Sequence, residues 1–466
     1  MTNLEKLYLR LPVPLQNLAV SMEGWRIGRT RYSREFYQLL AEAEGRTYLS
    51  PEQIQEYRDR RLREFVRHCV DTVPFYRERF HAAGIAPDEI RTLDDLRHLP
   101  ILTKQEVQDE YSRLLSQAVP ARDRVIVHTS GTTGAGLRFA STRRALREQW
   151  AIWWRYRRWH GIEPGTWCAY FGGRLVVPVG VSKPPFWRYN IPARQVMFSA
   201  YHMSPENLRA YVEELRRRRL PWIHGYPSVL ALLAAYILDE GLDLGYQVRW
   251  ITLGAENVLP QQVALLEKAF GVKPRQHYGM AEAVANISEC ELGSLHVDED
   301  FAAVQFVPNP NGPGERVIGT NLSNPATPLL RYEVGDIVTL GGTCACGRPG
   351  RVVAAIDGRN EDYIILRNGA RLGRMAHIFK DMVNIREAQI YQREPGVITL
   401  RVVRRPGYSE VDERRLLEKT RKRVGDDTEI RVEYWERLER SRTGKLRFVV
   451  SDIASGKLSS VGSGES

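Results

Sequence analysis

Beyond about residue 125, short apolar segments alternate with segments of helical periodicity, and this alternation restricts the possible folds more than any other feature. The stretch "RVIVHTS" is typical of a strand, and "TRRALREQWAIWWRYRRWHG" from Thr142 is typical of the helix that follows it. Further candidate strands are "TWCAYFGG", "QVMFSA", "PWIHGYP", "VRWITLGAE", "VKPRQHYG" and "AAVQFVP". Strands that alternate with helices form a sheet whose faces the helices cover. The sequence therefore predicts an α/β fold.

The remaining regions differ in their predicted secondary structure. Residues 1–125 read mainly as helices and loops, whereas residues 301–357 are richer in strand signals. After Ile356, three candidate strands and the helix "EVDERRLLEKTRKRVG" form a compact mixed segment, and the Gly/Ser-rich end is typical of disorder. A chain of 466 residues exceeds one simple core. We predict a large N-terminal domain of several subdomains over 1–358, a small α+β C-terminal domain over 359–454 and a disordered tail over 455–466.

Charge and hydropathy narrow the functional classes. The formal charge is +11, and arginine dominates it, as in "RRRRL" at 216–220. In the helix from Thr142 the arginines and the aromatic residues fall on different faces, which predicts a solvated face over a buried one. Because no zinc-finger, RRM or helix-turn-helix pattern accompanies the charge, we do not expect nucleic-acid binding. A basic surface also suits a small anionic substrate such as ATP.

The chain has no run of 18 apolar residues, which predicts no transmembrane helix. Its first residues lack the basic start and the continuous apolar segment of a signal peptide. We therefore expect a cytoplasmic protein that has no membrane partner. The oligomeric state is open, with a homodimer as one option.

One loop suggests a phosphate site. The candidate strand at 124–128 ends in a small polar segment and is expected to turn there toward a helix. The segment consists of Thr129, Ser130, Gly131, Thr132, Thr133 and Gly134. Backbone N–H groups and hydroxyls at such a turn bind anions, and glycines let the backbone approach closely. The pattern lacks the lysine of a Walker A motif, and a plain Gly/Ser turn is the alternative.

Five further segments follow in order: "TLGAENV" at 252–258, "HYGMAEA" at 277–283, "RYEVGDIV" at 331–338, "IDGRNEDYIILRNG" at 356–369 and "ERSRTGKLRF" at 439–448. With this series the chain resembles the adenylate-forming superfamily of acyl-CoA synthetases, peptide-synthetase adenylation domains and luciferases. It most resembles phenylacetate–CoA ligases and their relatives in polysaccharide gene clusters, through residues 73–107 and "YFGGRLVVPVG" at 170–180. The resemblance spans roughly residues 60–450.

The resemblance implies a nucleotide site. Residues 129–134 would hold the β- and γ-phosphates of ATP. The other implied residues are Gly254, Ala255 and Glu256 at the adenine, Tyr278 against the base, Gly279 and Met280 beside the α-phosphate, Asp336 at the ribose, and Arg359. Glu282 matches the acidic position that binds Mg²⁺, a hard cation that prefers carboxylate oxygens. Ala135 and Gly136 stand where many relatives have a lysine, which leaves Mg²⁺ a larger share of the charge neutralisation.

The resemblance also implies how the reaction would proceed. Lys445 would contact the substrate carboxylate and the α-phosphate, where a point cation stabilises the charge that develops on phosphorus. The small C-terminal domain would be mobile and would rotate between two half-reactions. The implied hinge lies at 359–362 with Glu361 at the pivot, and Gly369 would face the acyl acceptor.

The implied function is an AMP-forming acid–thiol ligase, with coenzyme A as the expected acceptor. The alternatives are transfer to an amine, a hydroxyl or a carrier-protein thiol, and a non-catalytic homologue. Candidates for the acyl pocket are Tyr170, Phe171, Gly173, Arg174, Trp187, His224, Tyr226 and Pro227. The aromatic residues suit an aryl or arylacetic acid, although such residues fill cores equally well. Arg174 or Arg188 could instead accept a second acidic group.

Four other side chains form a candidate metal site. Cys290 and His296 lie in "ECELGSLH", and Cys344 and Cys346 lie in "CACG". Three thiolates and one imidazole are the ligand set of a closed, structural zinc site. The alternative is a group of buried thiols beside an ordinary histidine.

Overall fold

The computed structural model describes residues 7–128, 137–178, 180–310, 313–359, 364–367, 371–372, 375–379, 382, 384–440 and 446–453. A twelve-stranded sheet forms the centre of the large domain, and a separate four-stranded sheet forms the C-terminal domain. The predicted fold class, a large α/β domain followed by a small α+β domain, is confirmed. Among the described residues, no helix combines the length and the apolar composition that a membrane crossing needs.

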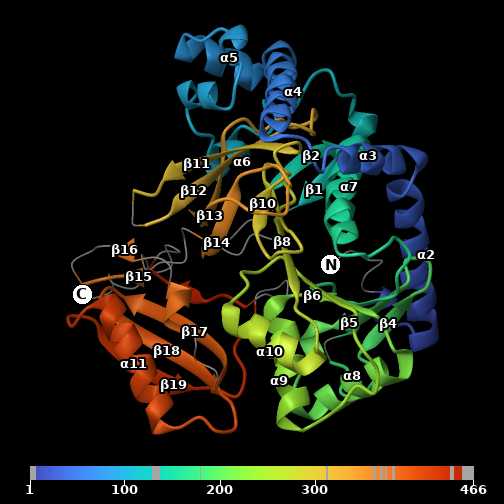
Figure 1. The fold of residues 1–466 in the computed structure, drawn as a ribbon, viewed down its shortest axis with the longest axis vertical. Helices are drawn as coiled ribbons and strands as arrows, with labels where there is room; N and C mark the ends of the chain where they lie inside the picture. Colours follow the sequence, from blue (N-terminus) through green and yellow to red (C-terminus); the bar gives the residue numbers. More distant parts are fainter. Residues whose placement is uncertain are drawn as a thin grey trace, which may run out of the picture.

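Helices dominate the N-terminal part of the chain, as predicted. They are α2 (Val13–Arg31), α3 (Arg34–Gly45), α4 (Pro51–Thr72), α5 (Pro74–Ala83) and α6 (Lys104–Asp109). Ser50 begins α4 with a capping box, in which its hydroxyl accepts from Gln53 N and Gln53 reaches back to the backbone of Ser50. The apolar sides of α4 and α5 pack over the strand-rich subdomain, in the upper part of Figure 1.

The parallel part of the central sheet comprises β3 (Cys168–Gly172), β5 (Gln195–Ser199), β6 (Trp222–Gly225), β7 (Trp250–Leu253) and β8 (Arg275–Gly279). The strand β4 (Trp187–Asn190) closes one edge in the antiparallel direction. One face of these strands packs on α8 (Pro205–Arg218), α9 (Pro227–Asp239) and α10 (Pro260–Phe270), which lie together in Figure 1. The five parallel strands are ones that the sequence predicts.

The antiparallel part continues the same sheet beyond β8. It comprises β9 (Asn286–Glu289), β10 (Leu295–Val297), β14 (Val352–Arg359), β13 (Tyr332–Leu340), β12 (Glu315–Asn321) and β11 (Ala302–Pro308), in spatial order. The strand β8 therefore pairs in parallel with β7 and antiparallel with β9. Because β8 lies between the two halves of the sheet, the segment that follows it reaches the strand-rich subdomain.

One local prediction was wrong. The strand β1 (Arg124–His128) does not lead into a helix; it pairs antiparallel with β2 (Arg138–Thr142) in a separate two-stranded sheet. The helix α7 (Arg143–Trp159) begins only after β2, where Thr142 accepts from Ala145 N as its N-cap. "RFAST" is too short and too mixed in polarity to stand out as a strand without its partner. The candidate phosphate loop therefore connects two strands.

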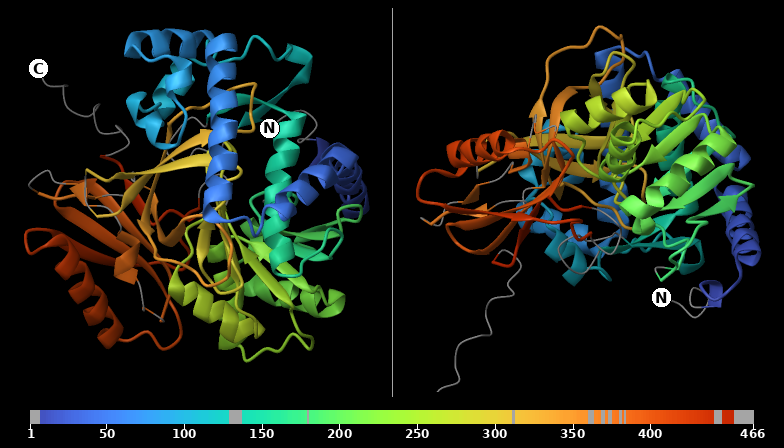
Figure 2. Two further views of the ribbon diagram at one scale, coloured as in Figure 1. Left: turned by 45° about the horizontal axis from the view of Figure 1, so that its top comes forward. Right: turned by 90° about the horizontal axis from the view of Figure 1, so that it is seen from below.

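The C-terminal domain is a sheet with one covering helix. Its strands are β17 (Ile385–Glu394), β18 (Val397–Arg404), β19 (Glu429–Tyr434) and β20 (Val449–Ser451), its helix is α11 (Glu410–Val424), and a short pair β15 (Ile364–Ile365) and β16 (Arg371–Leu372) precedes them. Figure 2 shows this domain, in orange and red, to one side of α8–α10. Asp239 at the end of α9 pairs with Arg386 and Arg405 across the boundary.

Candidate functional site

A cavity of about 750 Å³ lies over the parallel strands. Successive residues of a strand point to opposite faces of a sheet. The residues of one face line the cavity: Cys168 and Tyr170 from β3, Trp222 and His224 from β6, and His277 from β8. Their neighbours face the other way and form the core with α8–α10: Ala169, Phe171, Ile223, Ile251 and Leu253. The helices α2 and α7 supply a further part of the cavity wall.

The cavity opens onto the carboxyl ends of these strands, where α/β sheets bind ligands. Gly254 and Ala255 directly follow β7, and Gly279 ends β8; all three line the cavity. Ala255 has φ +67°, and Ala283, just after Glu282, has φ +57°. Positive φ costs free energy in an alanine, and such strain gathers at functional sites. At Gly279, a Cβ atom would lie only 2.7 Å from Asn286 Oδ1, so the residue must be glycine.

Two predicted nucleotide-binding residues from separate segments meet at this edge. The hydroxyl of Tyr278, on β8, donates a hydrogen bond of 2.7 Å to Asp336 Oδ2, on β13. The carbonyl of Met280 accepts from Gln149 Nε2 of α7 at 2.6 Å. The carbonyl of Glu282 accepts from Asn321 Nδ2 at 3.2 Å. The segment after β8 is thereby held between α7 and the antiparallel strands.

Glu256 lies at the boundary with the C-terminal domain. Its carboxylate accepts from Ser228 N at 3.1 Å and from Leu446 N at 3.2 Å. Burial raises the pKa of Glu256, although the nearby Arg440 opposes the shift. Arg440 also donates to Ser228 Oγ at 2.7 Å. These contacts fix the backbone of Leu446 beside the segment at 254–256.

Several predicted residues lie outside the described part of the chain. They are Lys445, Glu361, Gly369 and the loop residues Thr129, Ser130, Gly131, Thr132, Thr133 and Gly134. For Arg359 the structure describes the backbone, as the last residue of β14, and not the side chain. The roles of all these residues stay predictions.

Of the predicted acyl-pocket residues, Tyr170, Phe171, His224 and Tyr226 line the cavity, and so does Arg174. The ring of Phe171 stacks on Phe198 in the core, with centroids 4.6 Å apart. The carbonyl of Gly173 accepts from the Tyr201 hydroxyl at 3.0 Å. The guanidinium of Arg188 is buried and donates to Gln16 Oε1 and to the carbonyl of Pro185, so it does not reach the cavity.

The helical wall of the cavity could not be predicted from the sequence. The residues that α2 and α7 contribute include Trp25, Arg31, Trp150, Trp153, Trp154 and Arg157. We predicted a solvated face for the arginines of α7, and for Arg155 and Arg157 that was wrong, because both are buried. The aromatic spacing from Trp150 to Trp154 marked a buried face, but it could not indicate that the face borders a cavity.

Two histidines of the cavity are held neutral. Burial lowers the pKa of His224 to about 3 and that of His277 to about 4, and the charge of Arg157 adds to both shifts. The Nε2 atom of His277 lies 2.9 Å from Asn286 Oδ1, and because that oxygen accepts, Nε2 carries the proton. The neutral rings leave the positive charge of the cavity to its arginines.

A buried ionic network supports the wall from behind. Arg155 is 4 % exposed and donates to Asp298 Oδ1 at 2.7 Å and to Asp300 Oδ2 at 2.7 Å. Asp298 also accepts from Asn286 and Ser288, and Asn286 accepts from Trp153 of the cavity. Burial alone would raise the pKa of Asp300, but Arg155 and Arg46 hold that pKa below its usual range.

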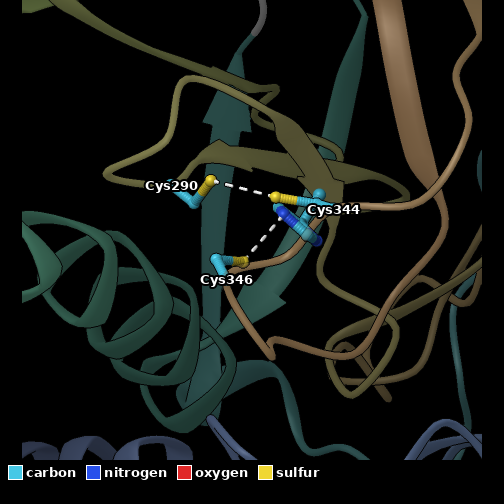
Figure 3. Close-up of side chains that lie close together, drawn as sticks. Cys290, Cys344 and Cys346 are labelled. Atoms are coloured by element: carbon cyan, nitrogen blue, oxygen red, sulfur yellow. Dashed lines mark hydrogen bonds between the residues drawn. The ribbon is translucent and has the colours of Figure 1, made fainter.

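The four predicted metal ligands converge at one point. Ligand atoms of Cys290, His296, Cys344 and Cys346 all lie within 4.8 Å of one another, and Figure 3 shows the three sulfurs turned toward one another. The Cys290 and Cys344 sulfurs are 3.8 Å apart, and the Cys346 sulfur lies 3.3 Å from His296 Nε2. Tetrahedral zinc with bonds of about 2.3 Å to sulfur places two sulfurs about 3.8 Å apart. The residues therefore fit a zinc ion.

Comparisons with known proteins agree with this architecture. The profile of the CapK C-terminal domain family matches residues 365–452. Protein CapK of Staphylococcus aureus is 26% identical over 97% of this chain and 100% of its own length. The phenylacetate-coenzyme A ligase of Thermus thermophilus is 29% identical over 68% of this chain and 73% of its own.

Solved structures extend the comparison to the whole fold. A 2-hydroxyisobutyryl-CoA ligase in the postadenylation state superposes with a TM-score of 0.70, at 19% identity, over 87% of this chain and 91% of that one. The same ligase in the thioesterification state gives 0.52 at 20% identity and the same coverage. With its ordered motifs, its fold and relatives that match over most of its length, the chain belongs to the adenylate-forming superfamily.

Proposed function

We propose that the protein activates a carboxylic acid with ATP and then transfers the acyl group to a thiol, with coenzyme A as the acceptor. The observation that carries the proposal is the meeting of three motif segments at one cavity mouth. Gly254 and Ala255, Gly279, and the hydrogen-bonded pair Tyr278–Asp336 come from distant parts of the sequence. The relatives named as phenylacetate-coenzyme A ligases support the same chemistry.

In the first half-reaction, a carboxylate oxygen of the acid attacks the α-phosphorus of ATP. The bond from that phosphorus to the bridging oxygen breaks, and pyrophosphate leaves. No side chain of the protein forms a covalent bond, so its task is to align the reactants and to stabilise the charge on phosphorus. We assign the latter role to Lys445 and assign Glu282 to Mg²⁺, whose binding supplies further charge neutralisation. The Tyr278–Asp336 pair would hold the nucleoside.

In the second half-reaction, the thiol attacks the acyl carbon and AMP leaves. The TM-score is higher against the ligase in the postadenylation state than against the same ligase in the thioesterification state. This difference supports a domain arrangement that corresponds to the stage directly after adenylation. The contacts described across the boundary include several polar ones: Leu446 N to Glu256, Arg440 to Ser228, Gln261 to the carbonyl of Phe379, and the pairs of Asp239. Polar contacts of this kind suit a domain that reorients, with Glu361 as its proposed pivot.

A second acceptor deserves a test, because the relatives differ in coverage. Protein CapK matches 97% of this chain, whereas the phenylacetate-coenzyme A ligases match 68%. The C-terminal domain also matches the CapK profile. We therefore keep, as the alternative, transfer of the acyl group to an amine, a hydroxyl or a carrier-protein thiol.

The test is carboxylate-dependent exchange of labelled pyrophosphate into ATP, across aryl, aliphatic and dicarboxylic acids. We expect exchange with one class of acid and a loss of at least about a hundredfold in Lys445→Ala, as for other preorganised charge contacts. Lys183→Ala, at an exposed loop lysine, is the matched control. Full exchange by Lys445→Ala would refute the mechanism. Product formation that does not depend on added coenzyme A would support the alternative acceptor.

We also propose that Cys290, His296, Cys344 and Cys346 bind a structural zinc ion. The site would tie the turn after β9 to the loop between β13 and β14, two segments that no described strand pairing joins directly. Four protein ligands leave no open position for a substrate, which assigns the ion a structural role. Metal analysis should find about one zinc per chain; its absence from protein purified without chelators would refute the site.

A further inference from the structure

The cavity concentrates arginines that lack acidic partners. Arg31 of α2, Arg157 of α7 and Arg174 after β3 all line it. Among the described residues, none of the three forms an ion pair. The carboxylate of Glu23, whose pKa the charge of Arg174 helps to lower, is paired with Arg26 at 2.7 Å. Burial lowers the pKa of Arg31, and the charges of Arg174 and Arg157 lower it further.

Arg157 is the most enclosed of these residues. It is only 8 % exposed, and its Nε and Nη1 atoms are buried without a hydrogen-bond partner in the described part of the chain. Its guanidinium lies over indole rings, 5.0 Å from the centroid of Trp154, 5.4 Å from that of Trp222 and 5.8 Å from that of Trp150. Indole faces attract a cation but cannot accept its N–H bonds in the plane of the guanidinium.

A buried charged group without hydrogen-bond partners costs free energy. Its presence in a folded protein is explained where a bound ligand supplies the missing hydrogen-bond acceptors. The contrast with Arg155, two residues earlier on α7, is direct. Arg155 is equally buried but donates to two aspartates, so its charge is neutralised by the protein. Arg157, Arg31 and Arg174 present three guanidinium groups to a cavity of about 750 Å³ with indole walls. Anionic oxygens are the chemistry that would satisfy them.

The position of Arg157 separates it from the reacting end of the site. It packs on Trp222, the first residue of β6, whereas the motif residues follow the carboxyl ends of the strands. Three residues of strand separate Trp222 from Gly225, or about 10 Å. A group bound at Arg157 is therefore distinct from the carboxylate that would be activated beside Gly279.

We propose that the acid this protein activates carries a second anionic group, a carboxylate or a phosphate, which Arg157 and the neighbouring Arg31 bind. This inference rests on the proposed function. It replaces the simple aryl or arylacetic acid that the aromatic residues suggested, while leaving the indole walls to contact a flat or apolar spacer between the two anions. Arg188, which the sequence offered as an alternative, does not bind the second anion, because its N–H groups donate to Gln16 and to the carbonyl of Pro185.

Matched probes test the proposal. We would titrate 4-carboxyphenylacetate, 4-phosphonophenylacetate and the monoanionic isostere 4-carbamoylphenylacetate into the full chain by calorimetry, and measure pyrophosphate exchange with each. A charge-assisted hydrogen bond to the buried arginine should give the dianions about 10-fold to 100-fold tighter binding than the isostere. Arg157→Met should abolish that preference, and Arg157→Lys should retain part of it. Arg31→Met serves as a second variant, and Arg158→Met, on the same helix and paired with Glu44, as the control.

The outcomes separate the two proposals. A preference for the dianions that Arg157→Met removes and Arg158→Met keeps supports the second anion. Equal binding of the dianionic and the monoanionic probes, or binding of neither, overturns it. Exchange with monoanionic acids alone would overturn the second anion while leaving the proposed function intact. Tight dianion binding without exchange, in protein that binds no ATP, would instead count against the proposed function and support the anion site.

Discussion

Replacing Arg155 by methionine tests whether the buried network supports the cavity wall. The guanidinium makes four hydrogen bonds, to Asp298 Oδ1, to both carboxylate oxygens of Asp300 and to the carbonyl of Ala43. Methionine fills much of the same volume but leaves two buried carboxylates without their main cation. Both aspartates are nearly inaccessible, at 4 % and 2 % exposure.

The expected loss follows from the partners that remain. Removing one member of a buried ion pair costs about 3–5 kcal/mol, because a charge stays buried without compensation. Asp300 keeps Arg46 at 2.8 Å, whereas Asp298 keeps only the neutral donors Asn286 and Ser288. Burial already raises the pKa of Asp298, and Arg155 is the charge that opposes it. We therefore expect a loss of about 3–5 kcal/mol, and expect Asp298→Asn in the same chain to recover part of it.

Urea unfolding followed by tryptophan fluorescence is the assay, since nine of the ten tryptophans precede residue 358 and only Trp435 follows it. Arg158→Met is the matched control on the same helix. Its side chain is 30% exposed and pairs with Glu44 and Glu163, so its loss should cost less than about 1 kcal/mol. Equal losses in the two variants, or no recovery with Asp298→Asn, would refute the assignment of buried charge as the cause.

Three further predictions concern the cavity and the metal site. Burial lowers the pKa of His277 to about 4, while the unfolded chain takes up this proton near pH 6.5; lowering the pH from 7 to 5 should therefore destabilise the fold by about 1–2 kcal/mol through this group. Urea titrations at both pH values should show a smaller loss in His277→Gln, and an equal loss would contradict the sign. Tyr278→Phe removes the hydrogen bond to Asp336 and should weaken ATP binding about threefold to tenfold by calorimetry; unchanged affinity would exclude the pair from the nucleotide site. Cys344→Ser should lower the zinc content and the Tm, whereas Cys69→Ser, away from the cluster, should keep the zinc.

The sequence alone determined the class of fold and the family. The periodicity of apolar residues predicted the parallel strands β3, β5, β6, β7 and β8, because each of them shows its own apolar pattern. The order of the motifs from 252 to 448 indicated the adenylate-forming superfamily before any geometry was available. Cys290, His296, Cys344 and Cys346 stood out as one ligand set because thiolate and imidazole chemistry is visible in the residues themselves.

The tertiary structure decided which segments pair with one another and which charges are neutralised, because neither is encoded in a local pattern of residues. The candidate phosphate loop connects β1 to β2. The sequence did not predict β2, because a strand as short as "RFAST" is defined by its pairing with another strand and not by its own composition. The arginines of α7 differ for the same reason. Arg155 is neutralised by aspartates about 145 residues away, Arg158 is part-exposed beside Glu44, and Arg157 faces a cavity. The charge of a side chain is a property of the sequence, but whether that charge is solvated, paired or left for a ligand depends on which distant segments fold against it.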